Sequence, residues 1–116
     1  MRRLTVETEQ EVLKAIERLL EEMKACSNQA YSLYRRCLIT EQEKRIIDFK
    51  YSNQIFERVL DTENINEMFF DSILVMEEFE KFNKLWEEKP EVIKLFSASA
   101  ITQLCCDTQL IGEMLS

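Results

Sequence analysis

The side chains that most enzymes use for acid–base chemistry are sparse in this chain. It has no histidine, so the commonest general base and the commonest metal ligand are both missing. Its single glycine is too little for a phosphate-binding loop. Glu77 and Glu80 have a Glu-x-x-Glu spacing that can hold magnesium on one helix, but no Glu-x-x-Asp follows to complete the site. We therefore expect exposed helix charges here and no enzyme activity, with a carboxylate–magnesium enzyme as the alternative.

The four cysteines also give little indication of a disulfide bond or a metal site. Cys26 and Cys37 are eleven residues apart in one predicted helix, about 16 Å, which is beyond disulfide reach and too far to share a metal ion. Adjacent Cys105 and Cys106 point about 100° apart on a helix and make a poor chelate. We predict four reduced thiols, at least two of them buried as small hydrophobic side chains, and neither metal nor cofactor.

Charge and hydropathy limit the classes of partner. The 116 residues carry a net charge of −7, and residues 63–89 hold eight carboxylates against three lysines. Such a chain repels phosphates, so we expect no direct nucleic-acid binding. The longest apolar run, residues 73–76, is far shorter than the roughly 20 residues that span a bilayer. No secretory signal is recognisable, and we predict a cytoplasmic protein without membrane insertion.

Apolar spacing predicts a long first helix. Thr8 and Glu11 have the spacing of a capping box at its start. From there, apolar and small side chains recur at alternating intervals of four and three as far as Cys37. Neighbouring apolar residues widen this stripe, which favours the core of a bundle over a two-stranded coiled coil.

Three further helices follow. The second begins at a Thr40–Glu43 capping box and continues to Leu60 with two apolar lines, in one of which Asn53 is expected to be hydrogen-bonded within the core. The third begins after Asn64 and presents an aromatic stripe that includes Trp86. The fourth begins at Pro90, breaks near residues 97–99 with Ser99 as a new cap, and ends near Gly112. Residues 1–116 are thus predicted to form one all-α domain, an antiparallel four-helix bundle.

One pair of residues breaks the amphipathic pattern of the third helix. Phe70 and Leu74 lie one turn apart, opposite the aromatic stripe. Either the fourth helix covers them, or they anchor a partner within a charged rim. The predicted partner-binding residues are Phe70, Leu74, Glu67, Glu77 and Glu78 on the third helix, with Tyr51 and Ile55 on the second.

The order of the helices resembles the GAT domain of endosomal sorting adaptors. The resemblance covers residues 9–88 and includes KYSNQIFERVL at residues 50–60 and SILVMEEFEKF at residues 72–82. It implies a three-helix bundle that binds ubiquitin and other trafficking proteins, and it leaves residues 90–116 as an addition.

The function predicted from these features is a non-enzymatic protein-interaction module, an adaptor or regulatory subunit. Its partner is either a different protein or, in a homodimer, a second copy of the chain. A second hypothesis is an acidic inhibitor, or nucleic-acid mimic, that occupies a basic groove of a target enzyme. The two hypotheses differ in salt dependence, since only the acidic inhibitor should lose affinity steeply as ionic strength rises.

Overall fold

The computed structural model describes residues 6–115, except for the side chains of residues 6, 7 and 70. This part of the chain contains helices and no strand, which confirms the all-α class. The helices are α1 (Val6–Arg35), α2 (Glu41–Asp48), α3 (Lys50–Thr62), α4 (Glu67–Phe70), α5 (Ser72–Glu88), α6 (Pro90–Ile93) and α7 (Ala98–Leu115). The described residues therefore form seven helical segments where four were predicted.

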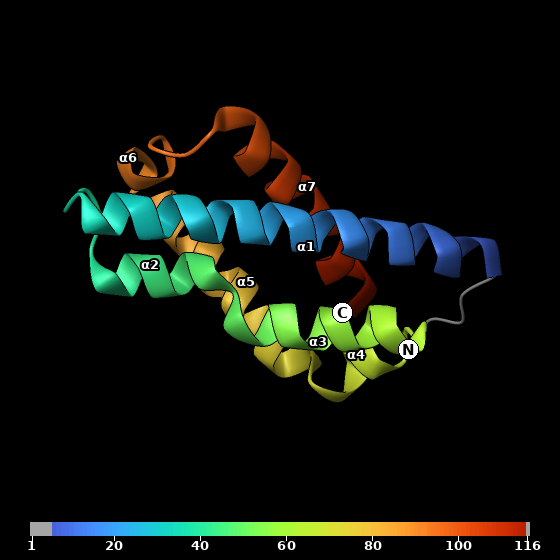
Figure 1. The fold of residues 1–116 in the computed structure, drawn as a ribbon. Coiled ribbons are helices and arrows are strands. Elements are labelled where there is room, and N and C mark those ends of the chain that lie inside the picture. Colours follow the sequence, from blue (N-terminus) through green and yellow to red (C-terminus); the bar gives the residue numbers. More distant parts are fainter. Residues whose placement is uncertain (1–5, 116) are drawn as a thin grey trace.

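The molecule is elongated and measures 45 × 21 × 21 Å, and α1 is the longest helix that the structure describes. Helices α2 and α3 follow one another along one side of α1, and α7 crosses it (Figure 1). The predicted stripe of α1 fills the core as far as Leu33; its buried members are Val12, Ile16, Leu19, Met23, Cys26, Ala30 and Leu33. None of the helices within residues 6–115 is long and apolar enough to cross a bilayer.

Both ends of α1 differ from the prediction. The helix is already present at Val6, the first residue that the structure describes, so Thr8 lies inside it and is not its cap. It ends at Arg35, two residues before Cys37, which is exposed and has a φ of 61°. The Leu38 N–H donates to the Leu33 carbonyl and the Cys37 N–H donates to the Tyr34 carbonyl, the pattern of a Schellman motif. Cysteine occupies the left-handed position that glycine usually takes.

The predicted capping box at the start of α2 is confirmed. The Glu43 N–H donates to Thr40 Oγ at 3.1 Å, and the Thr40 N–H donates to Glu43 Oε1 at 2.8 Å. Lys89 Nζ, from the end of α5, lies 3.1 Å from Glu43 Oε2. Burial tends to raise the pKa of Glu43, but the hydrogen bond from Thr40 and the charge of Lys89 outweigh it and lower the pKa below its ordinary value.

Replacing Thr40 with alanine should lower the free energy of unfolding by about 1 kcal/mol, because the Glu43 N–H loses its acceptor. Urea denaturation monitored by circular dichroism measures the difference. Thr102→Ala, at an exposed position within α7, is the matched control and should leave the stability unchanged or raise it by up to about 0.7 kcal/mol. Equal stability of the two variants would show that the cap does not hold the start of α2.

The predicted second helix is broken at Phe49. This residue is fully buried and has φ 48° and ψ 49°, a left-handed conformation that is unfavourable for a bulky side chain. Its ring lies 5.4 Å from the Phe82 ring and 6.2 Å from the Phe79 ring, between centroids. The break therefore inserts this ring into the aromatic core that α5 supplies.

Two side chains, those of Asn53 and Glu78, hydrogen-bond to backbone groups at the break. Asn53 Nδ2 donates to the carbonyls of Asp48 and Phe49, at 3.0 and 2.9 Å, which confirms that Asn53 is hydrogen-bonded. On the other side of the break, Glu78 of α5 accepts from the N–H groups of Tyr51 and Ser52, at 3.0 and 2.7 Å. Ser52 Oγ adds a third hydrogen bond to Glu78, at 2.6 Å. A carboxylate of another helix thus caps α3.

The second half of the chain is also more segmented than predicted. Asn64 accepts a hydrogen bond from the Asn66 N–H in a turn before α4, so it is not the cap of a long third helix. Pro90 occupies the first turn of α6, as predicted. The helical structure is interrupted at residues 94–97, between α6 and α7. Helix α7 begins at Ala98, before Ser99, and continues through Gly112, so both of those predicted boundaries are wrong. Trp86 remains 40% exposed instead of lying fully in the core.

Candidate functional site

The first turn of α5 presents apolar side chains to solvent. Ile73 is 73% exposed and Leu74 is 37% exposed, so Leu74 is not fully buried beneath another helix. Glu77 and Glu80, one and two turns further along the stripe of Ile73, are both exposed. The helix therefore presents an apolar pair beside two carboxylates.

Tyr51 lies beside this surface, because Glu78 joins α3 to α5. Glu78 is one turn from Leu74 on α5 and accepts a hydrogen bond from the Tyr51 N–H. The Tyr51 side chain is 45% exposed. We use the name α5 face for Tyr51, Ile73, Leu74, Glu77 and Glu80.

Other predicted partner-binding residues have different positions. Ile55 is only 3% exposed and packs in the core, so the prediction that it faces a partner is wrong. Glu67 Oε2 lies 3.9 Å from Arg58 Nε, across the turn between α3 and α4. Glu78 caps α3 and is not simply a charge at the rim. The side chain of Phe70 lies outside the described residues.

Sequence reasoning overlooked Ile73, although its signal is present. Residues 73–76 are four consecutive apolar residues, and four consecutive positions span about 300° of a helix. A helix that packs against one layer cannot bury all four side chains. Val75 takes the buried position, which leaves Ile73 on the solvent side.

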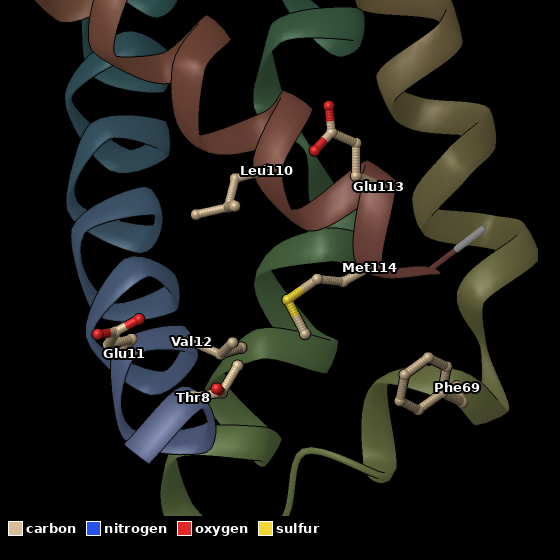
Figure 2. Close-up of a pocket in the computed structure, with 7 residues that line it drawn as sticks. All are labelled: Thr8, Glu11, Val12, Phe69, Leu110, Glu113 and Met114. Carbon is tan, nitrogen blue, oxygen red and sulfur yellow. The ribbon is translucent and has the colours of Figure 1, made fainter. Parts of the chain in front are cut away.

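A second surface feature lies near the N-terminal end of α1, close to the start of α5. A pocket of about 230 Å³ opens between the first turns of α1 and the last turns of α7, with Phe69 of α4 on its far side (Figure 2). Its lining combines apolar and polar side chains: Thr8, Glu11, Val12, Phe69, Leu110, Glu113 and Met114. The pocket is smaller than the roughly 300–1,000 Å³ typical of small-molecule sites. It is a weaker candidate than the α5 face.

A buried pair of carboxyl groups lies between α1 and α7. Asp107 is 3% exposed, and Glu22 Oε2 is fully buried without a hydrogen-bond donor. The two carboxyl groups lie close enough to hydrogen-bond to one another when one of them carries a proton. Arg18 Nη2 lies 3.4 Å from Asp107 Oδ1, and Gln103 Nε2 lies 3.5 Å from Asp107 Oδ2.

The surroundings of this pair raise the pKa of Glu22 to about 8. Burial is the largest cause, followed by the hydrogen bond to Asp107 and the charge of Asp107, and Arg18 only partly offsets them. The neighbouring Cys26 thiol is buried, and its pKa is raised to about 11 by burial, by Glu22 and by Cys105. Cys26 therefore remains a thiol at neutral pH and serves as a small apolar side chain of the core.

No set of three or more Cys, Asp or Glu side chains in the described part of the chain is arranged to hold a metal ion. Comparison with known proteins finds no family model that matches the chain, no similar curated protein and no similar solved structure. The function therefore has to be inferred from the geometry of the chain itself.

Proposed function

We propose that the protein is an interaction module that binds a partner protein through the α5 face. The observation that carries this proposal is the 73% exposure of Ile73 beside exposed Leu74. Single exposed apolar residues are common on protein surfaces, whereas adjacent ones with a charged border resemble the centre and rim of an interface. The partner is a helix or loop with apolar side chains flanked by lysine or arginine.

The chemistry of the face supports this choice of partner. Fully burying an isoleucine or leucine side chain contributes roughly 1.5–3 kcal/mol, so Ile73 and Leu74 together can anchor a contact. Glu77 and Glu80 add carboxylates that favour a basic border on the partner and disfavour an acidic one. The partly exposed Tyr51 side chain adds an aromatic residue from α3, and tyrosine is a residue type enriched at interfaces.

The test compares Ile73→Asp/Leu74→Asp with the wild-type protein. Both side chains are partly or largely exposed, so the variant should keep its melting temperature within a few degrees. Partners captured by the immobilised wild-type protein from a lysate of its native host, and identified by mass spectrometry, should be lost from the variant. Titration calorimetry with each purified partner should show at least a tenfold weaker Kd.

Leu95→Asp is the matched control, because Leu95 is 45% exposed and lies in the segment between α6 and α7. It should bind partners as the wild type does. Binding by the folded double variant that equals the wild type would overturn the assignment of the α5 face. A steep loss of affinity with salt, unaffected by the double substitution, would favour the acidic inhibitor instead. Ubiquitin, which the resemblance to GAT domains implies, can be tested directly with the same variants.

A further inference from the structure

The carboxyl groups of Glu22 and Asp107 lie where α1 packs against α7. Glu22 lies on α1 between core residues Leu19 and Cys26, and Asp107 lies on α7 between Leu104 and Ile111. All four of these apolar neighbours are within the core. Opening the contact between the carboxyl groups would therefore also separate the apolar faces of α1 and α7.

We propose that Glu22 and Asp107 form a proton-operated latch, which holds α7 against α1 while the two carboxyl groups share one proton and loosens α7 when that proton leaves. The shared proton supplies the hydrogen bond that buried Glu22 Oε2 otherwise lacks. Without it, two carboxylates lie close together in a partly buried site, where like charges repel more strongly than in water.

The charged neighbours cannot compensate for a second negative charge. Those that act on Glu22 belong to α1 and α7: Asp107, Arg18 and Glu21. Arg18 is the only cation among them; its side chain is 53% exposed and lies 3.4 Å from Asp107. It offsets one carboxylate, whereas Glu21 adds to the repulsion. Burial raises the pKa of the nearby Cys26 thiol to about 11 and also raises the pKa of the Cys105 thiol, so neither adds a negative charge near neutral pH.

The direction of the pH effect follows from where the proton binds more tightly. The folded protein raises the pKa of Glu22 from 4.5 to about 8, so between these values the folded state holds a proton that the unfolded state has released. Stability from this group is therefore fully present below pH 4.5, declines as pH rises, and is lost above about 8. The latch closes on the acid side of pH 8 and loosens on the alkaline side.

Hydrogen–deuterium exchange of the α7 amides tests the latch. In the wild-type protein, protection factors in α7 should fall at least tenfold between pH 6 and pH 9 after correction for the intrinsic exchange rate. Glu22→Gln keeps a neutral side chain that can donate to Asp107 at every pH, so its α7 protection should stay constant over this range. Glu21→Gln is the control, because Glu21 is exposed and adjacent, and it should behave like the wild type.

Two results would overturn the proposal. The first is wild-type protection in α7 that is equal at the two pH values. The second is the same pH dependence in Glu22→Gln as in the wild type. If Glu22→Gln does not fold, a carbon-13 NMR titration of the wild-type Glu22 carboxyl decides the matter: a midpoint above 6 supports the latch, and a midpoint near 4.5 rejects it.

Discussion

Phe49→Gly should be more stable than Phe49→Ala by about 1 kcal/mol, which reverses the usual order of these residues in helices. Both variants lose the buried ring that contacts Phe79 and Phe82, so both should lose about 3–5 kcal/mol relative to the wild type. The two variants differ in the steric cost of the left-handed backbone conformation at residue 49. Glycine adopts the left-handed conformation of residue 49 without steric cost, whereas alanine keeps the clash between its Cβ and the backbone.

Urea denaturation of the three proteins at pH 6 provides the measurement. If residue 49 were inside a continuous helix, as the apolar pattern of residues 40–60 predicts, alanine would be the more stable replacement by about 1 kcal/mol. That order of stability would contradict the break. Phe56→Ala is a reference for loss of a buried ring at a helical position, because Phe56 is fully buried in α3 and its ring lies 6.4 Å from that of Phe79.

Glu78→Ala should lower the free energy of unfolding by about 2–4 kcal/mol, an unusually large loss for a charged residue of a helix. Three donors lose their acceptor: the N–H groups of Tyr51 and Ser52, and Ser52 Oγ. Ser52 is fully buried, so water cannot easily take the place of the carboxylate. Each buried donor left without an acceptor costs about 1–3 kcal/mol.

The neighbouring residue provides the control for this prediction. Glu77 is exposed, so Glu77→Ala should change the stability by less than about 0.5 kcal/mol. Thermal unfolding followed by circular dichroism compares the two variants. Similar melting temperatures for both would show that the Glu78 carboxylate does not hold the start of α3. Glu78→Gln, which keeps one acceptor oxygen, should lie between Glu78→Ala and the wild type.

Features that depend on near neighbours in the sequence could be predicted. The capping box of Thr40 and Glu43 is formed by residues three apart, so its pattern is visible without a structure. The stripe of α1 is equally local, because one helical face repeats every three or four residues. Pro90 marks the start of a helix for the same reason.

The break at Phe49 could not be predicted in this way. The local pattern of residues 40–60 fits an unbroken helix, and the groups that favour a break include Glu78, 26 residues from Ser52. Long-range hydrogen bonds and aromatic packing therefore override the helical preference of the segment. The same reason explains why the sequence places Ile55 on a partner surface: only the packing of α3 shows that both of its apolar lines are buried, Phe56 in one and Ile55 and Val59 in the other.

The carboxyl pair had a signal that was not used. Glu22 lies three residues after Leu19 and four before Cys26, and Asp107 has the same relation to Leu104 and Ile111. Both are acidic residues in an apolar line, the same type of signal that predicted a hydrogen-bonded Asn53. What the sequence does not show is that α1 and α7 bring the two lines together.

The cap that Glu78 provides also sets an order of events during synthesis on the ribosome. Residues 40–62 emerge from the exit tunnel before Glu78 does, since Glu78 follows Ser52 by 26 positions. At that stage Asn53 can already act, because its acceptors lie within five residues, but the N–H groups of Tyr51 and Ser52 have no carboxylate. The nascent segment is therefore free to form one continuous helix. The bend at residue 49 belongs to the finished molecule, and it is completed only when the following segment arrives.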